Sequence, residues 1–135
     1  CALGNLACRN GFSSRYYRLP RLFTDLGIAR GDGSYPSFMR KLAKSDVLIL
    51  DDWGLGPLTA IESRELLEVL EDRCQSKSTV VASQVPVEKW YELMPDSTVA
   101  DAVMDRLVHN AYKIALQGES MRKIAATGRE KGGKA

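Results

Sequence analysis

The pattern of hydrophobic and polar positions divides this chain into short strand-like runs and longer helix-like segments. Strands are expected at Phe12–Arg18, Val47–Leu50, Thr79–Ser83 and Tyr112–Leu116. Helical spacing and turn residues predict helices over Cys1–Asn10, Leu22–Ala29 and Tyr35–Lys44, and further helices that begin near Thr59, Pro86 and Ser97. Strands that alternate with helices favour an α/β fold in which a parallel sheet is flanked by helices.

Two of the helices carry signals for where they begin and which face they bury. Thr59 is followed three residues later by Glu62, which predicts a capping box. The core face of this helix is expected to consist of Leu66, Leu67, Leu70 and Cys74. Ser97 or Thr98 is the expected cap of the later helix. The apolar face of that helix is expected to be Val99, Val103 and Leu107.

The apolar run Val47–Leu50 leads directly into two adjacent carboxylates, Asp51 and Asp52. Such a run predicts a buried central strand, and open α/β sheets place their ligands at the carboxyl ends of the strands. A Mg²⁺ ion with bound phosphates would offset the cost of burying two acids there. Asp51 would hold this ion, and Asp52 would orient or deprotonate the water that attacks a γ-phosphate. The alternative is that the pair only ends a strand and faces solvent.

Composition indicates an ordinary globular chain. Its 135 residues, 44% hydrophobic and 27% charged, predict one domain with a real core. The three cysteines are an odd number without metal-ligand spacing, which favours free thiols in a reducing compartment and a cytoplasmic protein. No apolar run of about 18 residues and no signal peptide occur, so no membrane partner is expected. The chain lacks an initiator Met, and we expect it to be a fragment of a longer protein.

The net charge of +2 is small, but its distribution is uneven, with a basic first third followed by an acidic segment. The basic group contains Arg15, Arg18, Arg21, Arg30, Arg40, Lys41 and Lys44, interleaved with Tyr16, Tyr17 and Tyr35. Cations with aromatic neighbours suit phosphate contacts and base stacking. Within this group the candidate DNA contacts are Arg18, Arg21, Arg30, Arg40, Lys41 and Lys44. The alternative is a solvated face without a partner.

Four other positions are ambiguous by themselves. Ser83 and Gln84 end a strand and could reach the same water or phosphate as the acid pair, or be an ordinary polar pair before a loop. Arg106 is expected on an exposed part of its helix beside Asp105, where a surface ion pair is the simpler interpretation. Arg122 is equally ambiguous.

Taken together, these motifs resemble the IstB-like transposition helper ATPases. The resemblance is carried by Tyr17–Leu22, Leu48–Gly54, Leu66–Arg73, Ser83–Val87, Asp105–Ala111 and Gly118–Arg122, in the order in which the family has them. It covers nearly the whole chain up to Arg122. Because these ATPases belong to the AAA+ initiator group, together with the DnaC helicase loaders and DnaA, the resemblance implies a partial AAA+ P-loop NTPase core with ATP and Mg²⁺ as cofactors.

The resemblance also implies a role for each candidate residue. Asp51 and Asp52 match the Walker B acids, and Ser83 or Gln84 matches the sensor 1 position. Arg106 matches the arginine finger, which acts on the ATP site of a neighbouring subunit in a homo-oligomer, and Arg122 matches the sensor 2 arginine.

The implied domain organisation has a core, an insertion and a tail. The AAA+ core is expected over residues 1–122, and it includes a helical insertion at about 19–45 that such proteins use against double-stranded DNA. Residues 123–135 are expected to form a polar, disordered tail.

One departure from the family is large, because no G-x-x-x-x-G-K-[ST] loop occurs in the sequence. The first strand and its phosphate-binding loop are therefore missing, and this chain is expected to bind ATP poorly.

Several functions remain open from the sequence. The first is an ATPase that assembles on target DNA and regulates a transposase, and the second is a DnaC-like loader of the replicative helicase. A phosphoacceptor receiver domain would need a third Asp where Ser83 and Gln84 stand. A non-catalytic fragment for DNA binding or oligomerisation is the remaining alternative.

Overall fold

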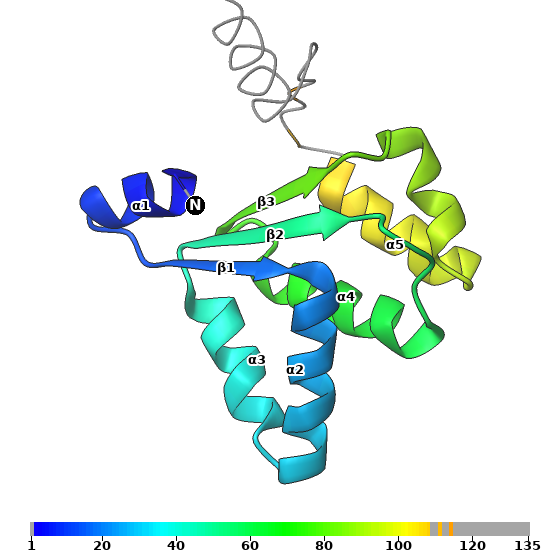
Figure 1. The fold of residues 1–135 in the computed structure, drawn as a ribbon, viewed down its shortest axis with the longest axis horizontal. Coiled ribbons are helices and arrows are strands. Elements are labelled where there is room, and N and C mark those ends of the chain that lie inside the picture. The colour runs from blue at the N-terminus through cyan, green and yellow to red at the C-terminus, as the bar shows by residue number, and fades with distance from the viewer. Residues whose placement is uncertain (1, 109–110, 112–113, 115–135) are drawn as a thin grey trace, which may run out of the picture.

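The computed structural model describes residues 2–108, 111 and 114, which form a three-stranded sheet with helices around it (Figure 1). The helices are α1 (Ala2–Arg9), α2 (Leu19–Asp32), α3 (Tyr35–Lys44), α4 (Ala60–Arg73) and α5 (Ser97–Val108), with the 3₁₀ turns η1 (Val87–Lys89) and η2 (Tyr91–Leu93). The strands are β1 (Ser14–Arg18), β2 (Val47–Trp53) and β3 (Ser78–Ser83). Within these described residues, no helix is both long and apolar enough to cross a membrane.

The sheet is parallel throughout, in the order β1-β2-β3. Leu50 of β2 lies opposite Tyr17 of β1 on one side and Val81 of β3 on the other. Leu48, Ile49 and Leu50 are all buried, which confirms the expectation of an apolar central strand. Since the strands run in the same direction, their carboxyl ends meet at one edge of the sheet.

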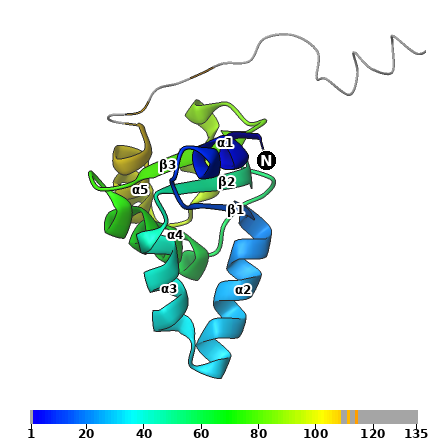
Figure 2. The ribbon, with the colours of Figure 1, turned by 90° about the vertical axis from the view of Figure 1, so that its left-hand side faces the viewer.

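The helices cover the two faces of the sheet unequally. The hairpin of α2 and α3 projects from one face, and α4 lies beside it on the same side (Figures 1 and 2). On the other face the single helix α1 lies near the start of β1, where the Ser14 hydroxyl donates a hydrogen bond to the Gly4 carbonyl at 3.1 Å. The expected α/β fold with a parallel sheet flanked by helices is confirmed.

Helix α2 begins earlier than the sequence pattern predicts. The helix starts at Leu19 rather than Leu22, because Pro20 in its first turn has no amide hydrogen to leave unpaired. The early start adds Leu19 to a buried stripe with Leu22 and Leu26. The helix ends at Asp32 and is capped by Gly33, whose φ of 83° is the left-handed conformation that glycine adopts without strain.

The capping box that opens α4 is confirmed. The Thr59 hydroxyl accepts a hydrogen bond from the Glu62 amide at 3.1 Å, and the Glu62 carboxylate accepts one from the Thr59 amide at 2.9 Å. The expected core role of Cys74 is wrong, because this residue follows the end of α4 and is exposed.

Two other local expectations need correction. Helix α5 is capped by Asp96 rather than Ser97 or Thr98, since the Asp96 carboxylate accepts hydrogen bonds from the amides of Thr98 and Val99 at 2.8 and 3.2 Å. The segment after Pro86 forms the turns η1 and η2 instead of one short helix. The expected strand Tyr112–Leu116 falls almost wholly outside the described residues, as do Arg122 and the tail 123–135.

A buried arginine joins α3, α4 and β3. The Arg73 side chain is only 1% exposed, and its guanidinium donates hydrogen bonds to the carbonyls of Leu42, Ser45 and Ser78 at 2.5, 2.6 and 2.6 Å. A further bond reaches the Thr79 hydroxyl at 3.0 Å. Burial lowers the pKa of Arg73 from its ordinary value. The guanidinium thereby satisfies carbonyls that the end of α3 leaves without a partner.

Replacing Arg73 should therefore destabilise the fold strongly. Arg73→Leu leaves buried carbonyls unsatisfied, and each hydrogen bond to a charged group is worth about 1.5–3 kcal/mol. We expect the free energy of unfolding, measured in urea, to fall by about 3 kcal/mol or more. Arg64→Leu is the matched control, because Arg64 is an exposed arginine on the same helix. Equal losses in the two variants would contradict the structural role of Arg73.

Candidate functional site

The acid pair lies on an irregularity at the carboxyl end of β2. Leu50 pairs with Val81 and Trp53 pairs with Ser83, so two residues of β2 lie between these pairs where β3 has one. These two residues are Asp51 and Asp52, and the irregularity is a β-bulge. Bulges of this kind change the direction of side chains at the edge of a sheet. The sequence alone gave no sign of this irregularity.

The backbone at the bulge is unusual. Asp52 has a φ of 58°, a left-handed conformation that aspartate tolerates better than most residues. Its amide donates a hydrogen bond to the Asp51 carboxylate at 2.8 Å, so the first acid stabilises the conformation of the second. Both side chains remain partly accessible at the carboxyl end of the sheet.

Each acid is held by a residue of β1. The alternation of a strand places Tyr16 and Arg18 on the same face of β1. The Tyr16 hydroxyl donates a hydrogen bond to Asp51, and the Arg18 guanidinium forms an ion pair with Asp52. The hydrogen bond to Asp51 is the main cause that raises the pKa of Tyr16 above its ordinary value. The hydrogen bond to Asp52 likewise raises the pKa of Arg18.

The acid pair fits a Mg²⁺ ion that also binds phosphates, but not a cage made of protein ligands alone. Carboxylate oxygens are the ligands that Mg²⁺ prefers, and the ion commonly uses one or two carboxylates with waters and phosphates completing its shell. Across the part of the chain that the structure describes, no cluster of three or more His, Cys, Asp or Glu residues could hold a metal. Asp51 and Asp52 are thus the residues that could hold Mg²⁺, with substrate oxygens as the remaining ligands.

The structure distinguishes Ser83 from Gln84, which the sequence could not. The Ser83 hydroxyl donates to the Trp53 carbonyl at 2.6 Å and accepts from the Val85 amide at 3.0 Å. Ser83 therefore joins the end of β3 to the end of β2. Gln84 is exposed, directly after the strand. Its side-chain amide is the group of the two that remains available for a ligand.

A tryptophan pair and a tight turn form the support beneath this edge. The rings of Trp53 and Trp90 lie 5.1 Å apart, and the Trp90 indole donates a hydrogen bond to the Val85 carbonyl at 2.9 Å. Gly54 has a φ of 86°, and a Cβ atom there would lie 3.0 Å from Cγ2 of Val85. The sequence did not predict the contact between these tryptophans, because Trp53 follows the expected central strand whereas Trp90 was expected on the helix after Pro86.

Arg106 is not at the acid pair of its own chain. Its guanidinium donates hydrogen bonds to the Ala102 carbonyl at 3.0 Å and to the Glu71 carboxylate of α4 at 2.9 Å. The expectation of an exposed position for Arg106 needs correction, because its side chain is only 29% exposed and forms an ion pair with Glu71.

Three of the six candidate DNA contacts are engaged in ion pairs within the chain. These pairs are Arg18–Asp52, Arg21–Asp25 and Arg30–Glu65. The other three candidates, Arg40, Lys41 and Lys44, lie on α3 and are exposed. The basic group is therefore not one continuous positive surface.

The Arg30–Glu65 pair ties the α2–α3 hairpin to α4. Glu65 is buried, and burial raises its pKa while the charge of Arg30 opposes that shift. Arg30 also lies over the ring of Tyr35, 5.9 Å from its centroid. Burial, with a hydrogen bond to Glu68, raises the pKa of Tyr35 to about 12. Tyr35 is thus engaged in packing rather than free for base stacking.

The sheet order and the helices around it are also found in solved structures of replication proteins, and this likeness concerns the fold. The crystal structure of DnaI aligns with a TM-score of 0.69 at 20% identity, over 81% of this chain and 60% of that one. The structure of replication initiator DnaA bound to AMPPCP and single-stranded DNA aligns with a TM-score of 0.63 at 20% identity, over 73% of this chain and 31% of that one. The chain thus has the fold of part of an AAA+ domain.

Sequence comparison then gives the family. The model of the family described as "IstB-like ATP binding protein" matches residues 1–127, so this chain belongs to that family. An insertion sequence ATP-binding protein of Sinorhizobium fredii, y4pL, is 53% identical over 123 residues, which are 91% of this chain and 50% of that protein. The chain therefore spans about half the length of this relative. The resemblance drawn from the motifs is confirmed.

The contact between Tyr16 and Asp51 can be tested by titration. Since a hydrogen bond to a carboxylate favours the protonated phenol, the pKa of Tyr16 should lie above 10 in the native chain. Asp51→Ala removes this acceptor and should lower the pKa toward 10, as measured by NMR of the ring carbon bonded to the hydroxyl. Asp101→Ala, at an exposed acid of α5, is the control. An unchanged Tyr16 pKa in Asp51→Ala would contradict the contact.

Proposed function

We propose that this chain supplies the Walker B half of an ATP site in a DNA-binding helper protein of transposition. The observation that carries the proposal is the acid pair on a β-bulge at the carboxyl end of the central parallel strand. Membership in the IstB-like family and the insertion-sequence relative support it. The missing P-loop would come from a longer parent, since the relative is about twice as long as this chain.

Each acid has a role that follows from its position. Asp51, which is hydrogen-bonded to the backbone of the bulge, would hold Mg²⁺, and Asp52 would orient the water that attacks the γ-phosphate. When bound, Mg²⁺ neutralises charge that develops on the phosphates. Arg18 forms an ion pair with Asp52, so the Arg18 guanidinium must move away from this carboxylate before Asp52 can orient the attacking water. Gln84 is the sensor residue of this proposal, because Ser83 is committed to joining two strand ends.

Arg106 acts in trans in this proposal. Its guanidinium is planar and permanently charged, which suits it to stabilise a phosphoryl group in transfer. Within its own chain it binds Glu71, so the finger must leave this carboxylate to reach the site of a neighbouring subunit. ATP hydrolysis would then require a homo-oligomer. Arg122 would act as the sensor 2 residue of the same site.

The client of the assembly is a transposase in this proposal, and double-stranded DNA is its platform. The insertion-sequence description of y4pL favours transposition over helicase loading. The alternative, a DnaC-like loader, has support from the likeness to DnaI, but at 20% identity that likeness concerns the fold alone. The exposed cations of α3 support contact with DNA.

The chain by itself should not bind ATP specifically. The amide cradle and lysine of a P-loop are absent from its sequence, so the strongest contacts to the β- and γ-phosphates cannot form. We expect isothermal calorimetry with Mg²⁺-ATP to show no saturable binding at about 1 mM nucleotide, a range in which many enzymes saturate. Micromolar affinity would show that the chain has another nucleotide site.

The catalytic roles can be tested in the full-length parent. Asp52→Asn should slow ATP turnover by about 10²–10⁴ while leaving nucleotide binding largely intact, because Asp52 acts on water rather than on phosphate. Arg106→Ala should slow turnover by roughly 10³–10⁵ in the assembled state. Mixing the two variants should restore part of the activity, since some interfaces then pair an intact site with an intact finger.

Glu71→Gln separates a finger from a structural ion pair. Both Glu71→Gln and Arg106→Ala break the pair between α4 and α5, but only Arg106→Ala removes the guanidinium. If ATP turnover stays at or above the native rate in Glu71→Gln but falls in Arg106→Ala, the role of Arg106 as an arginine finger is supported. If Glu71→Gln and Arg106→Ala lose activity equally, and mixing Arg106→Ala with Asp52→Asn restores none, Arg106 is a structural residue.

A further inference from the structure

The alternation of β1 divides the basic group between the two faces of the sheet. Tyr16 and Arg18 contact the acid pair on one face. Tyr17 belongs to the other face, where its ring lies 6.0 Å from that of Phe38 on α3. Arg15 shares this second face with Tyr17, because residues two apart on a strand point the same way. Arg15 is therefore directed toward the base of the helical hairpin and away from the candidate ATP site.

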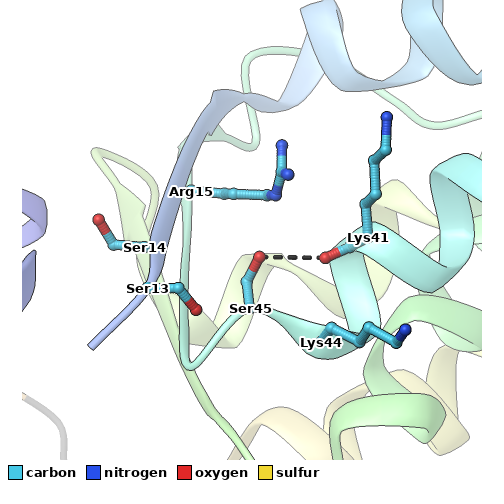
Figure 3. A pocket seen from close by; sticks show the side chains of 6 residues that line it. All are labelled: Ser13, Ser14, Arg15, Lys41, Lys44 and Ser45. Carbon is cyan, nitrogen blue, oxygen red and sulfur yellow. Dashed lines mark hydrogen bonds between the residues drawn. The ribbon is translucent and has the colours of Figure 1, made fainter. Parts of the chain in front are cut away.

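Arg15 meets two lysines of α3 at an open pocket of about 450 Å³. The pocket is lined by Ser13, Ser14, Arg15, Lys41, Lys44 and Ser45. Figure 3 shows the Arg15 side chain extending from β1 toward Lys41, with Lys44 below them on the last turn of the same helix. Among the described residues, none of these three cations is held in an ion pair, in contrast to Arg18, Arg21 and Arg30.

The surroundings favour an anion in this pocket. The carboxyl end of a helix is normally negative, but the buried Arg73 guanidinium binds the carbonyls of Leu42 and Ser45 at the end of α3. The neighbouring acid, Asp46, is neutralised by Lys77, whose ammonium lies 2.9 Å from its carboxylate. The pocket thus has three cations without an ion pair in the part of the chain that the structure describes. A buried fourth cation, Arg73, bonds the carbonyl of Ser45 in its lining, and the neighbouring acid Asp46 is compensated by Lys77.

The polar groups of the pocket indicate which kind of anion fits. The Ser45 hydroxyl donates to the Lys41 carbonyl at 3.1 Å, and the Ser14 hydroxyl donates to the Gly4 carbonyl at 3.1 Å. The Ser13 hydroxyl donates to Asp46 at 3.2 Å. Since these donors are engaged, the pocket has exposed cations but no set of hydroxyl donors directed at a specific small ligand. Contacts of this kind suit the phosphodiester backbone, which is bound through charge and without sequence readout.

We propose that Arg15, Lys41 and Lys44 form the phosphate-binding site through which this chain contacts the backbone of double-stranded DNA. The inference rests on the DNA-binding part of the proposed function and makes it specific. It adds Arg15, from a strand outside the helical hairpin, to the contact. It also expects Arg18, Arg21 and Arg30 to contribute less to DNA affinity, because each of them would first have to break an ion pair with an acid of its own chain.

The test compares two triple variants of the same chain with equal change in charge. The pocket variant is Arg15→Gln, Lys41→Gln and Lys44→Gln. The control is Arg9→Gln, Arg64→Gln and Lys89→Gln, at exposed cations outside the pocket. Binding to a fluorescein-labelled DNA duplex is measured by anisotropy over a series of salt concentrations. Circular dichroism and urea unfolding establish that both variants are folded, and the single variants Lys41→Gln and Lys44→Gln replace the triple if it is not.

The inference expects a selective loss in the pocket variant. Its affinity should fall roughly 10- to 100-fold near physiological salt, and its salt slope should fall by about 0.9 for each lost phosphate contact. A single variant should lower the salt slope by about 0.9, which corresponds to one phosphate contact. The control variant should change much less in both quantities.

The outcomes separate the inference from the function on which it rests. If the native chain binds DNA and the two triple variants lose affinity equally, or the pocket variant loses none, the pocket is not the contact although DNA binding stands. If calorimetry shows that the pocket variant has lost binding of inorganic phosphate or ATP while its DNA affinity is native, the site serves a free anion and the inference is overturned. If the native chain does not bind the duplex at all, the DNA-binding function itself fails.

Discussion

The parallel pairing of β2 with both of its neighbours is the constraint on which the rest of this structure depends. It brings the carboxyl ends of the three strands to one edge, so that Tyr16 and Arg18 of β1 reach the acids that follow the apolar run of β2. It also lets one extra residue in β2 form a bulge against β3. Asp52 has a left-handed backbone at this bulge, and both acids are partly exposed to solvent.

Several arginines in the described part of this chain are already bound by groups of the chain itself. Arg18, Arg30 and Arg106 are each paired with an acid from another element, and Arg73 is buried against carbonyls. Exposed ion pairs of this kind contribute little to stability. Their main effect is to determine which cations are available to bind a ligand. A cation that is already paired must lose that partner before it can bind phosphate, whereas an unpaired one need not.

The same strand serves both faces of the molecule. Side chains of β1 alternate between the acid pair and the base of the helical hairpin, so the candidate ATP site and the basic pocket lie on opposite faces of one edge strand. A movement of β1 would therefore change the surroundings of both the acid pair and the basic pocket. This arrangement offers a direct physical connection between the proposed DNA contact and the acid pair.

The sequence by itself determined the class of fold, the central strand, the capping box of α4 and the acid pair, because hydrophobic period and capping chemistry are local properties. It could not separate Ser83 from Gln84, the cap Asp96 from its neighbours, or the paired cations from the free ones. Those distinctions depend on partners distant in the chain, such as Trp53 for Ser83 and Glu71 for Arg106. Residue type sets which contacts a side chain can make, and only the tertiary structure decides which of them it makes.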